Sequence, residues 1–298
     1  MRNLQRALDA LGIPCQTDCD LKKHSSFRIG GCADLGIFPQ NREQLTKVLT
    51  LIRASEIPYL VIGKGSNVVF SDEGFTGAVI FTEGCRKMTR EGDEILADAG
   101  VPLVRLATYA LESSLGGAEF LHGIPGSLGG AVFMNAGAYG SSVSDVCICS
   151  EYFDSDTETV ITLRGEAQRF SVRSSIYTDH PQWVILGARL ALTPADPAEI
   201  RAKMEELASR RRTSQPLELP SAGSVFKRPV GNYAGKLIED CGLKGYRIGD
   251  AEVSVKHAGF IVNRGNASAA DVRRLVEHIR KTVLTQAGVT LECEIRFL

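Results

Sequence analysis

The stretch GIPGSLGGAVFMNAGAYG, residues 123–140, decides how this chain is read. Six of its eighteen residues are glycine, yet apolar residues such as Leu128, Val132 and Phe133 lie between them. Flexible linkers are polar and lack such anchors. Because glycine has no Cβ, the pattern predicts a loop that is fixed in the core while its backbone closely approaches another group.

A second glycine turn, GKGSN at residues 63–67, follows an apolar β-like run and precedes VVF. Two such turns with serine and asparagine side chains can hold a pyrophosphate from two sides. The alternative is that both are tight turns that only pack closely. Neither turn matches GxxxxGK[ST] or a GxGxxG between a strand and a helix, so P-loop and Rossmann sites are disfavoured.

The composition indicates an ordinary globular protein. The chain has 298 residues, a formal net charge of −1 and 44% apolar residues, which suits two compact domains or one large one. The charge argues against a nucleic-acid binder, and no window approaches a membrane span. The N-terminus is typical of a short amphipathic helix and not of a signal peptide, so we expect a cytoplasmic protein. The eight scattered cysteines and five histidines show no CxxC or HExxH spacing, which predicts free thiols and no metal.

The periodicity predicts mixed secondary structure. Apolar residues at helical spacing indicate helices over residues 42–55, with Asn41 as N-cap, and over 102–114, 198–212 and 269–286, the last stopped by Gly288. Strands are expected at 57–63, at 68–70, between 76 and 104, at 146–153, 159–163 and 183–192, and at the C-terminal LECEIRFL. Without regular βαβ alternation, these elements predict an α+β fold, with a domain boundary near LTPADP, 192–197.

Three polar residues are candidates for chemistry. Ser224 lies in SAGSVFKRP, beside Lys227 and Arg228, and could donate a proton or act as a nucleophile next to an anion site. No GxSxG elbow is present, so a hydrolase is disfavoured. Arg173 lies in the strand-like run VRSSIY, and Glu294 lies in the terminal strand. On the residues alone, the simpler interpretation is preferred for Ser224 and Arg173: Ser224 would lie in a polar turn before a strand, and Arg173 would be a surface arginine. Glu294 is similar, because one face of the terminal strand could be exposed.

Taken together, six segments resemble the UDP-N-acetylenolpyruvoylglucosamine reductase family, also called UDP-N-acetylmuramate dehydrogenases. They are HSSFRIGGCAD, VIGKGSNVVFSDEGF, GAEFLHGIPGSLGGAVFMNAGAYG, SAGSVFKRP, AGKLIEDCGLKGYRIGDAEVS and LECEIRFL, in the family's order from about His24 to Leu298. The resemblance implies an FAD-binding unit of vanillyl-alcohol-oxidase type with two subdomains, residues 1–80 and 81–195. Residues 196–298 would form an α+β substrate domain.

The resemblance also implies the chemistry. NADPH would reduce a non-covalently bound FAD, and hydride from flavin N5 would reduce UDP-N-acetylglucosamine enolpyruvate to UDP-N-acetylmuramate, a cytoplasmic step of peptidoglycan synthesis. Arg173 matches the arginine that steadies the substrate carboxylate, Ser224 the serine that protonates the carbanion, and Glu294 the glutamate that works with the arginine. We expect a monomer with no nucleic-acid or membrane partner.

The family's binding residues carry over onto two sets of positions. The substrate contacts implied are Lys227 and Arg228. The FAD contacts implied are Arg28, Ile29, Gly30, Gly63, Lys64, Gly65, Ser66, Asn67, Pro125, Gly126, Ser127, Gly129, Gly130, Asn135, Ala136 and Gly137.

Three departures from the family's pattern are visible. Lys64 stands where a glycine is usual, and Cys293 stands where the family often has proline, which adds an oxidisable thiol beside Glu294. The interval between Arg173 and Ser224 leaves no room for an inserted tyrosine loop, so the chain resembles the shorter subclass. Two rival functions stay open: an FAD oxidase, with His122 as a conceivable flavin tether, and a nucleotide-binding regulator without catalysis.

Overall fold

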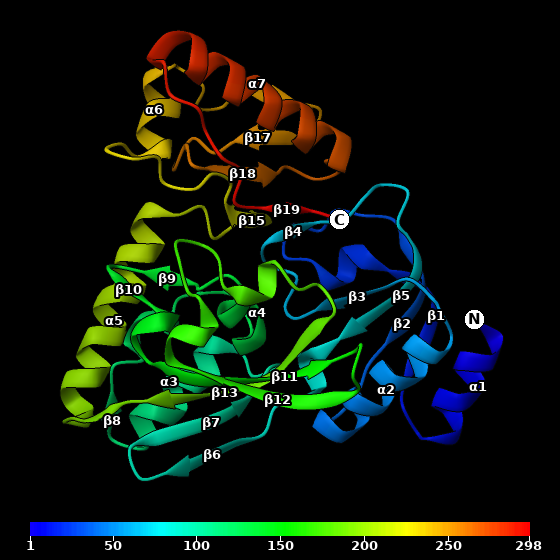
Figure 1. The fold of residues 1–298 in the computed structure, drawn as a ribbon. Coiled ribbons are helices and arrows are strands. Elements are labelled where there is room, and N and C mark those ends of the chain that lie inside the picture. Colours follow the sequence, from blue (N-terminus) through cyan, green and yellow to red (C-terminus); the bar gives the residue numbers. More distant parts are fainter. The chain divides into compact units, whose positions relative to one another are not determined.

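The computed structural model describes residues 1–298, and close packing divides them into two compact units. Unit 1 comprises Met1–Thr17, Leu35–Lys64 and Gly77–Arg210, and unit 2 comprises Asp18–Asp34, Gly65–Thr76 and Arg211–Leu298. Figure 1 labels their elements. None of the helices combines the length and the apolar character that crossing a bilayer requires.

The first sheet has the strand order β1-β2-β5-β3, and β3 and β5 are parallel. Its elements are β1 (Cys15–Asp20), β2 (Cys32–Ile37), β3 (Tyr59–Ile62) and β5 (Phe75–Phe81), with helices α1 (Arg2–Ala10) and α2 (Arg42–Ala54). The predicted helix over 42–55 is confirmed. Asn41 Oδ1 accepts a hydrogen bond from Gln44 N at 2.9 Å, and one face of α2 is buried. The helix therefore begins and packs as its sequence pattern indicates.

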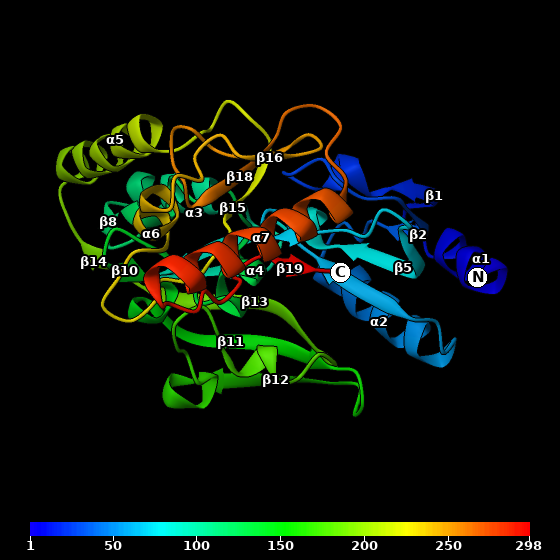
Figure 2. The same ribbon diagram turned by 90° about the horizontal axis from the view of Figure 1, so that it is seen from above.

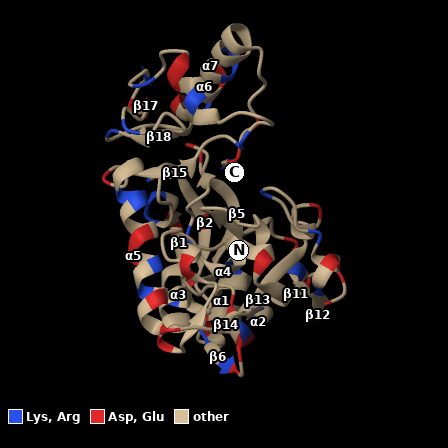
Figure 3. Ribbon diagram, turned by 90° about the vertical axis from the view of Figure 1, so that its left-hand side faces the viewer, with Lys and Arg blue, Asp and Glu red and all other residues tan.

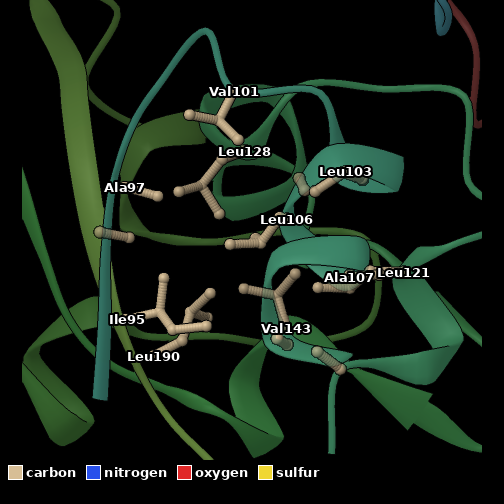
Figure 4. Packing of buried hydrophobic residues seen from close by; sticks show 14 of the residues in the cluster. Ile95, Ala97, Val101, Leu103, Leu106, Ala107, Leu121, Leu128, Val143 and Leu190 are labelled. Carbon is tan, nitrogen blue, oxygen red and sulfur yellow. The ribbon is translucent and has the colours of Figure 1, made fainter. Parts of the chain in front are cut away.

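The second sheet of unit 1 is antiparallel, in the order β12-β11-β13-β7-β6. Its strands are β6 (Met88–Glu91), β7 (Glu94–Asp98), β11 (Cys147–Asp154), β12 (Thr159–Arg164) and β13 (Trp183–Ala191). Around it lie α3 (Leu103–Glu112), α4 (Leu128–Phe133), α5 (Pro197–Ser214) and the short strands β8 (Leu115–Gly116), β9 (Gly137–Ala138), β10 (Ser141–Ser142) and β14 (Thr193–Pro194). Figure 4 shows Leu106 of α3 and Leu128 of α4 packed with Ile95 and Ala97 of β7. The apolar residues of the glycine-rich stretch thus anchor it in this core.

Helix α5 packs against the second sheet of unit 1. Its buried residues Ile200, Met204 and Leu207 join the core of the second sheet, so the packing divides the chain after Arg210. Figure 3 shows Lys and Arg positions in blue and Asp and Glu positions in red mixed along α5. Within LTPADP, Thr193–Pro194 form β14 and Pro197 begins α5, so this segment joins two elements of unit 1. The predicted start of the substrate domain at residue 196 stays a prediction. The division of the FAD-binding part at residue 80 stays a prediction.

Unit 2 contains a four-stranded sheet in the order β15-β18-β17-β16. Its elements are β4 (Val68–Val69), β15 (Ser221–Ser224), α6 (Ala234–Asp240), β16 (Arg247–Ile248), β17 (Ala251–Val253), β18 (Phe260–Asn263), α7 (Ala269–Ala287) and β19 (Arg296–Phe297). Helices α6 and α7 pack together, as Figure 2 shows from above. Gly288 ends α7 with a φ of 67°, as predicted.

The C-terminal segment is less regular than the sequence predicts. Only Arg296–Phe297 forms a strand, and it pairs in parallel with β4. Residues before it bond instead to the chain after β15, since Lys227 N donates to Glu292 O at 2.9 Å and Glu294 N donates to Val225 O at 2.8 Å. This segment therefore changes partners along its length, which a continuous alternating pattern does not reveal.

Candidate flavin and substrate site

The two glycine turns meet inside unit 1. A Cβ added to Gly63 would lie 2.0 Å from Ser127 Oγ and 3.2 Å from Ser127 Cβ, so any larger residue there requires the two turns to shift. Gly129 is equally constrained, because its Cβ would lie 2.8 Å from Ala99 Cβ. Gly130 has room, with Ser127 Oγ at 3.7 Å. The close backbone approach predicted from the sequence is thus present. In this structure, the glycine backbones approach other segments of the protein, at Ser127 and at Ala99.

Ser127 carries the observation that points to a ligand. Its side chain is 2% exposed, and its Oγ has no hydrogen-bond partner in the protein. A buried hydroxyl without a partner is rare in folded proteins and calls for a bound group. His122 Nδ1 is likewise buried and unpaired. A phosphate or flavin polar atom at Ser127 would satisfy this hydroxyl, so the residues present fit FAD.

Several backbone groups around this loop already form hydrogen bonds within the protein. Leu103 N donates to Gly126 O at 3.0 Å, Ala136 N donates to Ala131 O at 2.8 Å, and Val143 N donates to Ala136 O at 2.9 Å. Pro125 precedes these positions without an N–H to offer. Among the predicted FAD contacts in this loop, Ser127 is the one whose buried side chain has no hydrogen-bond partner in the protein.

The Lys64 side chain points toward Glu83. Its Nζ lies 3.9 Å from Glu83 Oε1, and both side chains are well exposed. Such exposed pairs contribute little to stability. The side chain that stands where the family has a glycine therefore lies near Glu83, and the role of Lys64 as an FAD contact stays a prediction.

Residues 65–67 and 28–30 belong to unit 2, where they pack tightly. A Cβ on Gly65 would lie 2.0 Å from His24 O, and one on Gly30 would lie 2.6 Å from Phe70 Cβ. Arg28 has a φ of 57°, in the left-handed region. Ile29 is fully buried in the core of unit 2, and Ser66 is half-buried.

Asn67 links this turn to the C-terminal segment. Its Nδ2 donates to Glu294 O at 3.2 Å, and its own carbonyl accepts from Arg296 N at 3.0 Å. The GSN turn thus holds the residue that the sequence predicts at the substrate carboxylate. The role of these positions as FAD contacts stays a prediction.

Arg173 does not lie in a strand, which corrects the sequence interpretation. Ser171 and Ser174 exchange backbone hydrogen bonds of 3.0 and 3.3 Å, so Val172 and Arg173 form the tip of a tight turn. Arg173 has a φ of 55°, a conformation that is unfavourable for a residue with a Cβ. Its Nη2 donates to Gly137 O at 3.2 Å. Backbone strain of this kind concentrates at functional sites.

Ser224 and Glu294 lie on neighbouring segments of unit 2. Ser224 ends β15 opposite Phe260 and is exposed, and the next residue, Val225, accepts the hydrogen bond from Glu294 N. The structure therefore brings two of the three predicted catalytic residues onto paired segments. Arg173 belongs to unit 1.

The two predicted substrate contacts have partners within unit 2. Lys227 forms an ion pair with Glu292, and the Arg228 guanidinium lies 3.9 Å from the centre of the Tyr233 ring. The sequence analysis identified neither Glu292 nor Tyr233. Glu292 is 65 positions from Lys227, so no local spacing could have found it. An aromatic residue five positions after an arginine in a Gly-Pro loop was a weak signal for Tyr233.

Burial sets the reactivity of the cysteine beside Glu294. It raises the pKa of the Cys293 thiol, whose Sγ also lies 3.4 Å from Ile295 O. Oxidation requires the thiolate, so this thiol is less reactive than its position suggests. All eight cysteines are free, as predicted.

Comparison with known proteins gives the class first. Residues 33–164 match the family model "FAD binding domain". The structure resembles berberine bridge enzyme from Eschscholzia californica with a TM-score of 0.50 at 17% identity, over 65% of this chain and 44% of that one. These matches indicate an FAD-binding protein with the α+β fold of the vanillyl-alcohol-oxidase type.

The particular family follows from closer relatives. Residues 215–298 match "UDP-N-acetylenolpyruvoylglucosamine reductase, C-terminal domain". The reductase of that name from Caldanaerobacter subterraneus subsp. tengcongensis is 46% identical over 93% of this chain and 91% of its own length. The crystal structure of the Thermus caldophilus reductase has a TM-score of 0.80 at 34% identity, over 96% of this chain and 98% of that one. The chain belongs to the UDP-N-acetylenolpyruvoylglucosamine reductase family.

Proposed function

We propose that this protein reduces UDP-N-acetylglucosamine enolpyruvate to UDP-N-acetylmuramate with NADPH as the reductant, as a cytoplasmic monomer in peptidoglycan precursor synthesis. The observation that carries the proposal is the paired placement of Ser224 and Glu294 in the family-matched C-terminal part. Neither a generic FAD oxidase nor a non-catalytic regulator has a use for that pair.

FAD would be held in part by the glycine turns. The Ser127 hydroxyl, buried and without a protein partner, would donate to it, and Gly63 would let the backbone lie close. Bound FAD, once reduced by NADPH, supplies hydride for the enolpyruvyl double bond.

Ser224 is proposed to supply the proton. Addition of hydride to the terminal carbon of the enol ether leaves negative charge on the adjacent carbon, delocalised into the carboxylate. A positioned hydroxyl can protonate that carbon. Ser224 suits this role because it is exposed at the end of β15, where a ligand can reach it.

Arg173 and Glu294 are proposed to stabilise the substrate carboxylate while it carries this charge. A guanidinium at the tip of a constrained turn offers a fixed array of donors, which suits a planar carboxylate. Lys227 contributes less to the Ser224 alkoxide than an isolated ammonium would, because Glu292 already neutralises part of its charge. Arg228 is proposed to contact the substrate diphosphate.

Replacing Ser224 with alanine tests the proton donor. In anaerobic spectra, Ser224→Ala should still bleach with NADPH, but recovery of the flavin colour with the enolpyruvyl sugar should slow by several powers of ten. Ser221→Ala is the matched control, since Ser221 lies on the same strand β15 and has no proposed role. Equal loss of both half-reactions would exclude the proton-donor role. Recovery only with oxygen would favour the oxidase.

A further inference from the structure

Three hydrogen bonds tie the Arg173 turn to the segment after the glycine loop, and all lie within unit 1. Asn135 Nδ2 donates to Ser171 O at 3.0 Å. Arg173 Nη2 donates to Gly137 O at 3.2 Å, and Ser175 Oγ donates to Phe133 O at 2.8 Å. Phe133–Gly137 therefore contacts the turn before, at and after its tip.

The Asn135 side chain reaches the turn through a hydrogen bond to Ser171 O. It is 7% exposed, and its backbone has a φ of 41°, which asparagine tolerates better than most residues. Its Oδ1 accepts from Ser144 N at 2.9 Å while its Nδ2 donates to Ser171 O. Because both ends of the amide are engaged by backbone groups, little of it is left to bind a flavin.

The rest of the turn is fixed by a buried network. Ser150 Oγ on β11 lies 2.7 Å from both Gln168 Oε1 and the Tyr177 hydroxyl, and all three residues are fully buried. Gln168 and Tyr177 thus fix the chain on either side of the turn. Between them, the strained conformation of Arg173 persists only if its surroundings impose it. The Asn135 amide is the polar side chain that holds the first residue of the turn, Ser171.

We infer that Asn135 is a positioning residue for Arg173 and not a flavin contact. The inference rests on the proposed role of Arg173 at the substrate carboxylate. Asn135 fixes Ser171, Ser171 sets the turn, and the turn aims the guanidinium. This explains why an asparagine in the left-handed region stands here, where glycine would satisfy the backbone alone.

The test uses Asn135→Asp in the full chain with FAD. Aspartate tolerates the same φ and keeps the acceptor for Ser144 N, but it removes the donor to Ser171 O. FAD affinity and the rate of flavin reduction by NADPH should stay within about twofold of the parent, whereas reoxidation by the enolpyruvyl sugar should slow roughly 10- to 100-fold, the effect of a displacement near 1 Å. Asn135→Gly, which keeps the φ and adds no charge, is the second variant should the aspartate prevent folding.

A double-mutant cycle with Arg173→Lys separates positioning from independent effects. If Asn135 acts through Arg173, Asn135→Asp should slow reoxidation by less than about twofold in the Arg173→Lys background. Trp183, the single tryptophan, stacks on Tyr152 at 4.4 Å and reports by its fluorescence whether the surrounding chain stays folded. An unchanged tryptophan spectrum is expected in every variant.

The outcomes are distinguishable. Weakened FAD binding by folded Asn135→Asp, or equal loss of both half-reactions, overturns the inference and makes Asn135 a flavin contact. Additive effects in the cycle overturn it as well, and leave the proposed function standing. A parental reoxidation rate in Arg173→Lys overturns the proposed role of Arg173 and the inference with it.

Discussion

Gly63→Ala probes the contact between the two glycine turns. The new Cβ would lie 2.0 Å from Ser127 Oγ and 3.2 Å from Ser127 Cβ. Rotation of the serine hydroxyl can relieve the first overlap but not the second, so the two backbones must move apart by a few tenths of an ångström. Overpacking of this kind typically costs about 1–3 kcal/mol.

We expect most of that free energy to appear in FAD affinity, because Ser127 is the buried hydroxyl that the cofactor would satisfy. A loss of 1–3 kcal/mol corresponds to FAD binding that is roughly 5- to 150-fold weaker. The assay is titration of the apoprotein with FAD, followed by flavin fluorescence, together with thermal unfolding with and without FAD.

Two further variants make the result specific. Gly265→Ala is the control, because its Cβ would meet Asp250 Oδ2 at an ordinary 3.4 Å, and FAD affinity should not change. Gly63→Ala combined with Ser127→Gly removes the clash and should recover the folding stability but not the FAD affinity. Parental FAD affinity in folded Gly63→Ala would refute the reasoning that these turns enclose the cofactor.

Two other predictions concern stability. Asp72 accepts hydrogen bonds from Ala269 N at 2.8 Å and Ala270 N at 3.0 Å at the start of α7, so Asp72→Ala should destabilise the protein by about 1–2 kcal/mol and lower Tm by a few degrees, whereas an unchanged Tm would show that the cap is dispensable. Burial raises the pKa of Asp98, so the folded state binds more protons than the unfolded state between the ordinary and the raised pKa, and stability falls as pH rises through that window. Asp98→Asn, which keeps the acceptor for Lys87 N, should therefore raise Tm at pH 7 and have little effect at pH 3, and a Tm gain that persists at pH 3 would contradict the titration argument.

The sequence by itself determined the local elements. The spacing of Leu45, Val48, Leu49 and Ile52 placed helix α2, and Asn41 marked its start, since both signals lie within a few residues of each other. Gly288 ended α7 for the same reason. The glycine turns and Ser224 could be recognised because their residue types carry conformational and chemical meaning without reference to distant partners.

Only the tertiary structure decided which segments meet. Gly63 meets Ser127, and Asp72 caps a helix that begins 197 positions later, and no local period encodes such pairings. Arg173 lies in a run that is typical of a strand, but backbone hydrogen bonds between Ser171 and Ser174 close a turn there. The side chain of Asn135, which is distant in sequence, donates a further hydrogen bond to Ser171 O. Asn135 lies in a glycine-rich segment that suggests a cofactor contact, yet the two hydrogen bonds of its side-chain amide join it to Ser144 and Ser171. The packing of the whole chain fixes the partners of each side chain. The sequence therefore shows which chemical groups are present, and the tertiary structure determines which of them interact.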